Sequence, residues 1–494
     1  MLLSKGNSLR LLSQTLSSQS RRFTQLSTTS FNIDQNELQK DLEEPLIQHL
    51  TKRGLISQTS NPEDLENLLN KTKLGLYCGA DPTAKSLHLG NLLPLIILLH
   101  FNLRGHNIIG LVGGATGAVG DPSGRTTERS MMEDQTRLDN VTKIQNQLEG
   151  FFTNGIRYAK YLSTSHVIEE GLIKSKNNFE WWENVSFLGF LSTYGRHIRV
   201  AQMLARDSVK GRLESENGIG FNEFTYQILQ AFDFWHLFRN EQVSIQVGGN
   251  DQWGNITAGI DLINRLKTNL NKKDSLKNRS SFGITAPLLT TASGEKFGKS
   301  AGNAVFIDSK ITPSFDLYQY FIKTPDSEVS KLLKIFTLLP LKQIEEIISK
   351  HEQDPSLRYA QRILSNEVTD LIHGVGSGKS AAIISSILYP LPDQPYPDIG
   401  SDELIDAFEN ANVLKTLPKE EFLNKPFSFI LSKVQEISKN ESRKLISSGG
   451  VYQGFDRIRI DTSDSMLLGE DQLIDGKVLL LRVGKGKYHV IQLV

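Results

Sequence analysis

The chain has 494 residues, of which 38% are hydrophobic, and its 55 basic and 55 acidic side chains cancel. At roughly 150 residues per domain this length indicates about three domains, and the composition excludes wholesale disorder and fibrous repeats. A nucleic-acid partner would have to bind a local basic surface, since the whole chain supplies no net attraction. The one cysteine, Cys78, excludes an internal disulfide framework and zinc sites built on CxxC pairs.

The first thirty residues differ in kind from the rest of the chain. They hold four basic residues, eight serines and no Asp or Glu, with leucines at roughly helical spacing. This composition is typical of a mitochondrial transit peptide, which we predict over residues 1–32, with the mitochondrial matrix as destination. A disordered polar tail is the alternative. The acidic stretch 36–44 predicts the first helix of the mature chain.

A parallel βαβ unit is predicted next. A strand is expected at Leu74–Cys78, a helix at Leu89–Asn102 and a second strand at Asn107–Val112 that runs into glycines. The apolar part of this helix is interrupted by Pro94 and is too short to span a membrane, so we expect no membrane association. In such sheets ligands bind beyond the carboxyl ends of the strands, which predicts an active site in the loops that follow them.

A later strand and the C-terminal part complete the predicted organisation. A strand at Val243–Val247 enters a Gly-Gly-Asn-Asp loop and is followed by a helical pattern from 256 to 267. Beyond Phe306, leucine and isoleucine recur at spacings of three and four, which indicates a helical domain. The predicted ranges are a transit peptide at 1–32, a catalytic domain at 33–310, a helical domain at 311–400, a linker at 401–421 and a small α+β domain at 422–494.

Two loops carry polar side chains suited to a nucleotide. Asp81, Thr83 and His88 lie between the first strand and its helix, where free N–H groups of a helix N-terminus favour anions. The segment 294–300 places Lys296 and Lys299 on a glycine-flanked loop, where they could follow a moving polyphosphate. Each segment alone is also consistent with an ordinary surface turn.

A third pattern indicates a polar pocket on a helix. Tyr226, Gln230 and Asp233 are spaced at i, i+4 and i+7, which places them on one helix face, in a segment that also holds Phe224 and Phe232. A buried carboxylate needs a hydrogen-bonding partner, and a phenolic hydroxyl would supply one. An ordinary amphipathic helix is the alternative.

Together these motifs resemble a known family. His88-Leu-Gly-Asn91 and Lys296-Phe-Gly-Lys-Ser300 resemble the HIGH and KMSKS signatures of class I aminoacyl-tRNA synthetases. The wider segments 77–83, 112–123, 226–233 and 246–255 resemble bacterial and mitochondrial tyrosyl-tRNA synthetases, and the resemblance runs from about Leu46 to the C-terminus. It implies a Rossmann-type parallel-sheet catalytic domain, a helical anticodon-binding domain, an S4-like RNA-binding domain and a homodimer.

The resemblance also implies a reaction and its residues. L-tyrosine would react with ATP to give tyrosyl adenylate and pyrophosphate, and the tyrosyl group would then pass to mitochondrial tRNA(Tyr). The residues implied in tyrosine binding are Tyr77, Asp121, Tyr226, Gln230, Asp233 and Gln252. Those implied in ATP binding are Gly79, Asp81, Thr83, His88, Gly90, Gly249, Asp251, Lys296, Lys299 and Ser300. Catalysis is expected from His88, Asn91, Arg125, Arg129, Lys296 and Lys299, and RNA binding from Lys439, Arg443 and Lys444.

The remaining expectations concern metals, departures from the family pattern and rival functions. Mg²⁺ is expected to accompany ATP as a substrate complex, without a protein-ligated metal. Asn91 replaces the second histidine of HIGH, Arg125 stands where lysine is frequent, and Asn250 replaces a frequent serine. A group I intron splicing role remains an alternative or additional function, and a tryptophan-specific relative is disfavoured by Tyr77 and Asp233. The P-loop-like segment 373–380 lacks the first glycine and a preceding strand.

Overall fold

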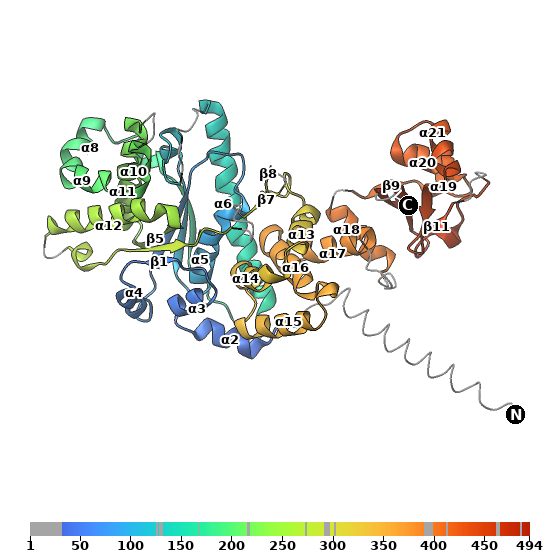
Figure 1. Cartoon of the computed structure of the whole chain (residues 1–494), viewed down its shortest axis with the longest axis horizontal. Helices are drawn as coiled ribbons and strands as arrows, with labels where there is room; N and C mark the ends of the chain where they lie inside the picture. Colours follow the sequence, from blue (N-terminus) through green and yellow to red (C-terminus); the bar gives the residue numbers. More distant parts are fainter. Residues whose placement is uncertain are drawn as a thin grey trace.

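The computed structural model describes three units that follow one another along the chain (Figure 1). The described residues are 32–124, 127, 132–165, 167–214, 218–271, 274–290, 297–300, 303–389, 399–411, 413–460, 465–484 and 487–494. The predicted transit peptide therefore lies outside the described residues, apart from Asn32. None of the described helices combines the length and the apolarity needed to cross a membrane.

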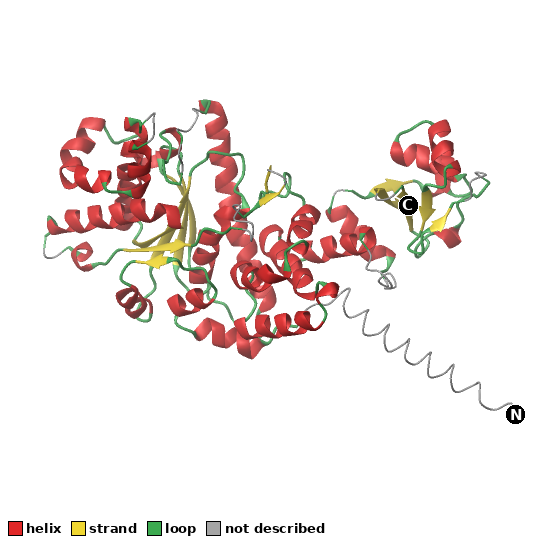
Figure 2. Ribbon diagram, viewed as in Figure 1, coloured by secondary structure: helices red, strands yellow, loops and turns green. Residues whose placement is uncertain are grey.

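A six-stranded sheet forms the centre of the catalytic unit (Figure 2). Its order is β1-β6-β5-β2-β3-β4, and every neighbouring pair is parallel except β1 with β6. The strands are β1 (Gln58–Thr59), β2 (Gly75–Ala80), β3 (Asn107–Val112), β4 (Ile173–Asn177), β5 (Val243–Gly249) and β6 (Phe282–Ala286). The direction of winding reverses between β2 and β5, and ligands of open parallel sheets bind at such a reversal. The predicted α/β class with a parallel sheet is confirmed.

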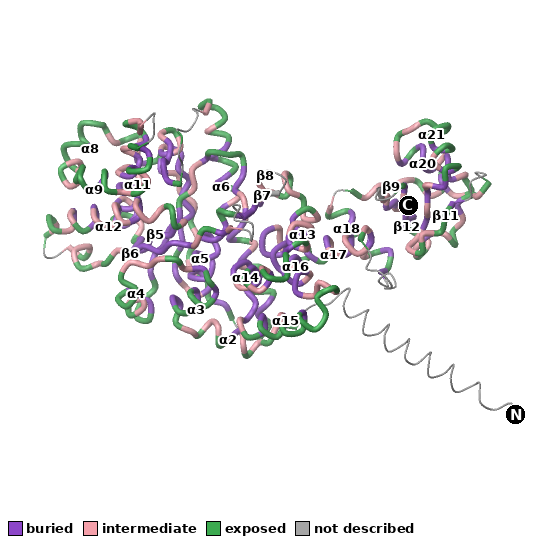
Figure 3. Tube along the Cα trace, in the orientation of Figure 1, coloured by how far each residue is buried: buried purple, intermediate pink, exposed green. Residues whose placement is uncertain are grey.

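Each face of this sheet is covered by a separate helix layer. Alternate β2 residues point to opposite faces, so that Leu76 packs with α5 (Leu92–Asn102) and α6 (Asp134–Leu162), while Tyr77 packs with α11 (Phe221–Asn240) and α12 (Trp253–Thr268). The sheet is buried between the two layers (Figure 3). This arrangement directs Tyr77 toward the helix that carries Asp233.

Short helices surround this framework. The chain begins with α2 (Gln35–Glu43), α3 (Leu46–Lys52) and α4 (Pro62–Leu69), and the connection from β4 to α11 contains α7 (Phe179–Trp182), α8 (Phe187–Thr193), α9 (Val200–Leu204) and α10 (Asp207–Leu213). The acidic helix predicted at 36–44 is α2. It begins at the N-cap Asp34, whose carboxylate accepts from the amides of Asn36 and Glu37.

The helical unit that follows contains six helices in its described part. They are α13 (Ser314–Ile322), α14 (Asp326–Phe336), α15 (Leu341–Gln353), α16 (Tyr359–His373), α17 (Ser377–Leu388) and α18 (Ser401–Asn410). His373 ends α16 and Ser377 begins α17, so the P-loop-like segment joins two helices and does not follow a strand. His373 Nε2 donates to the Ile307 carbonyl at 3.2 Å, and His373 Nδ1 bonds to the Ser314 hydroxyl at 2.9 Å, which gives His373 a structural role.

The C-terminal unit is a small mixed sheet covered by helices. Its strand order is β11-β10-β12-β13-β9, and its elements are β9 (Lys415–Leu417), α19 (Lys419–Phe422), α20 (Phe427–Gln435), α21 (Lys439–Ser447), β10 (Val451–Gln453), β11 (Ile458–Arg459), β12 (Val478–Val483) and β13 (Lys487–Leu493).

The structure differs from the linker expected at 401–421. This range contains α18, β9 and most of α19; β9 pairs in parallel with β13, and α18 packs against β12 and β13 through Leu404 and Phe408. The sequence signal was weak because β9 has only three residues, and its partner strand lies more than seventy residues later.

Candidate active site

A cavity of about 310 Å³ lies at the carboxyl ends of β2 and β5, where the winding of the sheet reverses. Its walls come from β2, β5, α11 and the loops after β2 and β3. It brings together fourteen of the residues expected from the sequence: Tyr77, Gly79, Asp81, Thr83, His88, Gly90, Asn91, Asp121, Tyr226, Gln230, Asp233, Gly249, Asp251 and Gln252. Side chains from distant parts of the sequence therefore face one space.

The Asp233 carboxylate is the most deeply held acidic group of this cavity. It is 2% exposed and accepts hydrogen bonds from Asn178 Nδ2 at 2.9 Å, Trp181 Nε1 at 2.8 Å and Trp182 Nε1 at 2.7 Å. Burial raises the pKa of Asp233 to about 7, while the three hydrogen bonds oppose that rise. The carboxylate is thus a fixed acceptor whose charge depends on pH near neutrality.

Two buried polar atoms of residues that line the cavity have no hydrogen-bond partner among the described residues. The Tyr77 hydroxyl is buried, with the residue 1% exposed, and the Gln246 Oε1 is buried in β5. A buried polar group left unpaired costs about 1–3 kcal/mol. Both residues line the cavity, so a ligand that carries a hydroxyl or an amine would satisfy them.

A second polar network crosses the middle of the cavity. The Tyr226 hydroxyl donates to Asp81 Oδ2 at 2.8 Å, Thr116 Oγ1 donates to Asp81 Oδ1 at 2.9 Å, and Asn178 Nδ2 donates to Thr116 Oγ1 at 3.0 Å. A Cβ at Gly113 would lie 2.0 Å from Asp81 Oδ1, so only glycine leaves room for this arrangement. Asp81 therefore contacts Tyr226, which is expected to bind the ammonium group of tyrosine. Asp81 also lines the part of the cavity that is expected to hold ATP.

Asp121 belongs to a third network, formed with amide side chains. Gln252 Nε2 donates to Asp121 Oδ2 at 2.7 Å, and Gln230 Nε2 donates to Gln252 Oε1 at 3.2 Å. Asn255 Nδ2 donates to Gln230 Oε1 at 3.1 Å, and the Ser123 amide donates to Asp121 Oδ1 at 2.9 Å. Asp121, Gln230 and Gln252, which the sequence placed together, thus share one hydrogen-bonded cluster.

The HIGH-like segment forms a capped 3₁₀ turn, η1 (Leu89–Asn91), in front of α5. The Gly90 amide donates to His88 Nδ1, and the His88 amide donates to Asn91 Oδ1, both at 3.0 Å. This reciprocal pair is a capping box. Asn91, the departure from the family pattern, therefore acts as a capping side chain and leaves the exposed backbone of the turn open to the cavity.

The two signature segments lie side by side. The Leu89 amide donates to the Val305 carbonyl at 3.0 Å, and the Val305 amide donates to the Gly298 carbonyl at 2.7 Å. Gly298 has a φ of +86°, and a Cβ there would lie 3.1 Å from Leu89 Cβ. The Phe297 ring stacks on Phe336, with centroids 5.5 Å apart, so the helical unit anchors this segment.

Several expected residues cannot be placed from the structure. Arg125, Arg129 and Lys296 lie outside the described residues. Lys299 and Ser300 form the short strand β7, which pairs with β8 (Asn303–Ala304), but their side chains are not described. Their expected roles remain predictions.

Among the residues that line the cavity or bond to Asp233, the sequence did not single out Asn178, Trp181, Trp182 and Gln246. Gln246 lay inside a recognised segment and could have been found from its position at the end of a strand. The other three directly follow the short edge strand β4: Asn178 is the N-cap of α7, and the two tryptophans lie in this helix of four residues, where no periodic pattern is available. Two adjacent tryptophans in a polar stretch were the one visible signal.

Cys78 lies against the cavity but is not a candidate nucleophile. Burial alone raises the pKa of its thiol to about 12, so the thiolate is scarce at neutral pH. This agrees with packing or a nucleotide contact as the role of Cys78.

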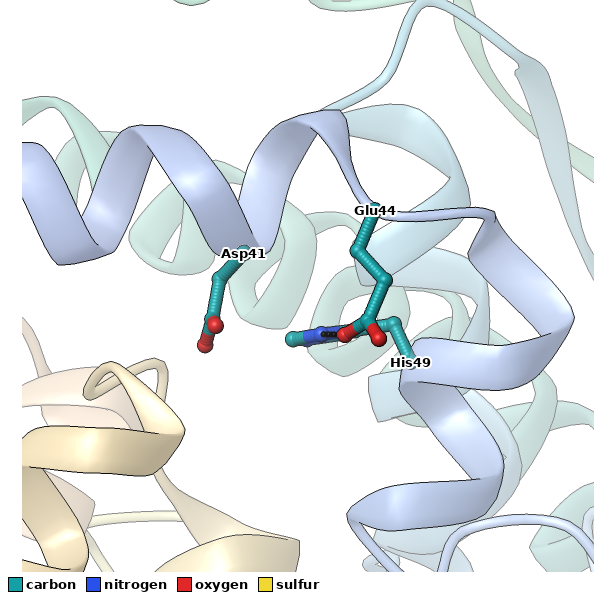
Figure 4. A group of neighbouring side chains, drawn as sticks. All are labelled: Asp41, Glu44 and His49. Atoms are coloured by element: carbon teal, nitrogen blue, oxygen red, sulfur yellow. Dashed lines mark hydrogen bonds and ion pairs between the residues drawn. The ribbon is translucent and has the colours of Figure 1, made fainter.

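A second cluster of titratable groups lies far from the cavity, where Asp41, Glu44 and His49 approach one another between α2 and α3 (Figure 4). Its atoms are already engaged. His49 Nε2 accepts from Arg53 Nε at 2.8 Å, His49 Nδ1 contacts Glu44 at 3.2 Å, and Glu44 also pairs with Lys52. Burial and then Arg53 lower the pKa of His49 to about 2, so it is neutral.

This cluster fastens the N-terminal helices to the helical unit. The Arg53 guanidinium is buried and donates to the carbonyls of Lys334, Thr337 and Leu339, while Asp41 accepts from the Leu341 amide. Arg53 would repel a cation, so the cluster is a structural joint and we assign no metal to it.

The parallel sheet, the cavity at its winding reversal and the two adjoining signature segments define the catalytic domain of a class I synthetase. The family model of class I tRNA synthetases for tryptophan and tyrosine matches residues 69–389, and the chain belongs to this family.

Individual relatives narrow this class. The chain is 49% identical over 452 residues to the mitochondrial tyrosine–tRNA ligase of Saccharomyces cerevisiae, which covers 91% of this chain and 89% of the relative. It is 39% identical to the tyrosine–tRNA ligase of Staphylococcus carnosus over 92% of this chain and 99% of the relative. A C-terminally truncated mitochondrial tyrosyl-tRNA synthetase of Aspergillus nidulans superposes with a TM-score of 0.64 and 33% identity, covering 76% of this chain and all of that one.

Proposed function

We propose that this chain is a mitochondrial tyrosine–tRNA ligase, which activates L-tyrosine with ATP and transfers it to mitochondrial tRNA(Tyr). The observation that carries the proposal is the buried pair Tyr77 and Asp233 on one cavity wall, with the Tyr77 hydroxyl unpaired among the described residues. A substrate phenol would pair with the Tyr77 hydroxyl and with the open acceptor site of Asp233, whereas phenylalanine would leave the Tyr77 hydroxyl without a partner and that site unfilled. Sites built to bond a hydroxyl reject the analogue without it by about 10⁴–10⁵-fold, and tyrosyl enzymes are themselves the standard example of that figure.

The proposed chemistry needs positioning more than proton transfer. The tyrosine carboxylate attacks the α-phosphorus of ATP, the bond to the bridging oxygen breaks, and pyrophosphate leaves with the bonding electrons. Negative charge grows on the phosphate oxygens, so fixed donors and cations lower the barrier. The turn at His88 and Gly90 lies beside the described segment that contains Gly298 and Lys299, which supports this placement of ATP.

Asp121, Tyr226 and Gln230 are proposed to hold the ammonium group of tyrosine, and Gln252 to lie near its carboxylate. Asp81 would contribute to both substrates, since it accepts from Tyr226 and lines the nucleotide side. Mg²⁺ would enter bound to the phosphates of ATP and neutralise part of their charge. We expect no dedicated protein cage for it, since Asp81 and Asp121 are already hydrogen-bonded within the cavity wall.

Tyrosine-dependent exchange of labelled pyrophosphate into ATP tests this proposal, run in parallel with tryptophan and phenylalanine. We expect exchange with tyrosine and little with the other two, because only tyrosine pairs with Tyr77 and Asp233. Equal exchange with tryptophan, or none with tyrosine, would refute the assignment.

RNA binding by the C-terminal unit is proposed from the exposed basic side chains of α21. Lys439, Arg443 and Lys444 are exposed, and the capping box of Ser438 and Glu441 fixes the start of this helix. Arg459 lies across the turn that follows, since a Cβ at Gly449 would lie 1.3 Å from its Nη2. A short helix with such a turn is suited to RNA phosphates, as in S4-like domains.

Alanine at Lys439, Arg443 and Lys444 together should weaken tRNA binding and flatten its salt dependence, while adenylate formation persists. Removing one phosphate-binding cation reduces the slope of log affinity against log salt by about one. An unchanged salt slope in the triple variant would contradict the RNA-binding role.

A homodimer is proposed through the end of the catalytic unit that lies away from the helical unit (Figure 1). Large apolar side chains are exposed on its helices: Phe187, Leu188, Leu191, Val200, Leu204, Leu213 and Phe221. Exposed apolar patches of this kind mark protein interfaces, and the family resemblance makes a second copy of the chain the occupant. Leu188→Asp should convert the dimer to a monomer in sedimentation velocity; a wild-type monomer would refute the proposal.

The proposed location is the mitochondrial matrix, supported by the transit-peptide composition of residues 1–32 and by the mitochondrial relatives. Fusion of these residues to a fluorescent protein tests it. A splicing role is not part of the proposal, because the described residues give no specific observation in its favour. The first described helix, α2, carries three acidic side chains against one lysine and offers no basic RNA surface.

A further inference from the structure

Two consecutive tryptophans bond to the same oxygen of Asp233. Trp181 Nε1 and Trp182 Nε1 both donate to Oδ1, at 2.8 and 2.7 Å, while Asn178 donates to Oδ2. Neighbouring residues of a helix normally face different directions, so this convergence requires both indoles to be held in place. The four-residue helix α7 ends at Trp182, which allows the second ring to turn back toward α11.

Different neighbours hold the two rings. The Trp181 ring stacks on His236, with centroids 4.3 Å apart and planes 14° from parallel. The Trp182 ring packs against Phe232 at 4.8 Å and against Phe190 of α8 at 5.5 Å. Both His236 and Phe232 belong to α11, the helix that carries Asp233, so carboxylate and donors are fixed to one element.

The two indoles leave the carboxylate with one orientation for a further hydrogen bond. An indole N–H only donates, and an ionised carboxylate offers about four lone-pair sites, two on each oxygen. Oδ1 is filled by two donors, whereas Oδ2 accepts only from Asn178 among the described residues and keeps a site open. With a single indole donor, Oδ1 would also be available and the acceptor position would be less defined.

We propose that Trp182 is a specificity-determining positioning residue, whose indole N–H is the second donor that fixes Asp233 so that Oδ2 accepts the phenolic hydroxyl of the substrate. This inference rests on the proposed tyrosine activation and extends it. Trp182 need not touch the substrate, since it acts through Asp233 and does not line the cavity itself.

The charge of Asp233 provides a readout that packing alone would not change. Burial raises its pKa to about 7, the donors Asn178, Trp181 and Trp182 lower it, and Asp81 raises it further. Tyr77 and Tyr226 face the same space as neutral phenols, because burial raises the pKa of each. Behind Trp181, burial lowers the pKa of His236, so that ring is neutral as well.

Trp182→Phe tests the proposal, because phenylalanine keeps an aromatic ring but removes the N–H. Selectivity for tyrosine over phenylalanine in pyrophosphate exchange should fall about 10- to 100-fold, as expected for one lost hydrogen bond to a charged group. The acid limb of kcat/KM for tyrosine should also move to higher pH, since one donor that favours the carboxylate is gone. KM for ATP should stay unchanged.

Trp235→Phe is the matched control, because it removes an indole N–H from the helix that carries Asp233, and no bond between Trp235 and Asp233 occurs among the described residues. It should leave selectivity and the acid limb unchanged, even if it lowers the melting temperature. In an Asp233→Asn background, Trp182→Phe should cause no further loss of selectivity, as required if the two residues act together.

If the phenylalanine variant does not fold, a tryptophan analogue with sulfur in place of the indole N–H can be incorporated at position 182. This analogue keeps the shape of the ring and removes the donor. Unchanged selectivity with an unchanged acid limb, in a folded variant, would overturn the inference. Wild-type exchange with tyrosine is measured first, so that failure of the proposed function is seen separately as absence of any tyrosine-dependent exchange.

Discussion

The two halves of the cavity are built differently. On the amino-acid side, Asp233 and Tyr77 are almost fully buried, and the bonds from Asn178, Trp181 and Trp182 hold the carboxylate rigidly. On the nucleotide side, the walls are backbone turns with glycines, half-buried at His88, exposed at Gly90 and joined to the segment that contains Gly298. The amino-acid half is held by side-chain hydrogen bonds to a buried carboxylate, whereas the nucleotide half is formed largely by the backbone of a more exposed turn.

This difference teaches how recognition and chemistry can be separated within one cavity. Discrimination between similar amino acids requires hydrogen-bonding groups that are fixed and shielded from water. An unpaired buried group raises the free energy of the complex only if it cannot turn to another partner. Phosphate chemistry requires groups that meet charge as it develops. Substitutions in the two halves of the cavity should therefore have separable effects on selectivity and on the adenylation rate.

The largest effect is expected from Asp233→Asn. The asparagine side chain has the size of aspartate but no charge, and its NH₂ group would face the N–H donors of the surrounding side chains. Selectivity for tyrosine over phenylalanine should therefore fall by about 10²–10³-fold. Tyr77→Phe should cause a smaller loss in the same direction. Pyrophosphate exchange with both amino acids measures this, and KM for ATP is the control. Unchanged selectivity in both variants would show that the amino-acid half has been misplaced.

The corresponding change in the nucleotide half is Lys299→Ala. Its charge is expected to act mainly as pyrophosphate develops, so the adenylation rate should fall by about 10²-fold while tyrosine affinity stays the same. Pre-steady-state adenylate formation and equilibrium tyrosine binding separate the two quantities. A defect confined to tyrosine binding would contradict the division between the halves.

Protonation of Asp233 at low pH should weaken tyrosine activation and increase the stability of the fold. As pH falls through about 7, Asp233 gains a proton, so kcat/KM for tyrosine should drop about tenfold per pH unit. Stability has the opposite sign, because a carboxyl whose pKa is raised in the folded state favours folding at low pH and loses that contribution as pH rises toward 7. Asp233→Asn should remove the acid limb of activity and reduce the pH dependence of stability, to which Asp370, whose pKa burial also raises to about 7, contributes as well. Activity is measured by pH-rate profiles and stability by urea unfolding across pH 4–8.

A smaller effect is expected from Tyr320→Phe in α13. The Tyr320 hydroxyl accepts from the Gly298 amide at 3.0 Å and thereby fixes one end of the signature segment. Losing one neutral hydrogen bond should slow adenylation or raise KM for ATP by about 2- to 10-fold, without changing amino-acid selectivity.

Tyr318→Phe, two residues earlier in the same helix, is the matched control because no hydrogen bond from its hydroxyl to the signature segment occurs among the described residues. If both variants slowed adenylation equally, the effect would come from the helical unit in general and the Gly298 contact would have no special role.

The sequence predicted the framework of the site well. The strand expected at Asn107–Val112 has those bounds in the structure, and the i, i+4, i+7 spacing of Tyr226, Gln230 and Asp233 does place all three on the cavity. These signals are local, because strand alternation and helix periodicity are visible within a few residues.

The partners of Asp233 were not predictable in the same way. Trp181 and Trp182 precede it by about fifty residues and lie in a helix too short to show a period. Their approach depends on β4 pairing at the sheet edge, which places α7 over α11. Likewise, nothing local indicated that Tyr226 donates to Asp81, because that bond joins two elements across the cavity.

The pairing of β9 with β13 also determines when the C-terminal unit can form. β9 precedes the helices of this unit, yet its partner consists of the last residues of the chain, and the Lys419 amide donates to the Val494 carbonyl. During synthesis the catalytic unit can fold while this sheet still lacks an edge, since domains fold as units in the order in which they emerge. The RNA-binding surface proposed on α21 would therefore be completed only after β13 has been synthesised, later than the catalytic unit and the helical unit.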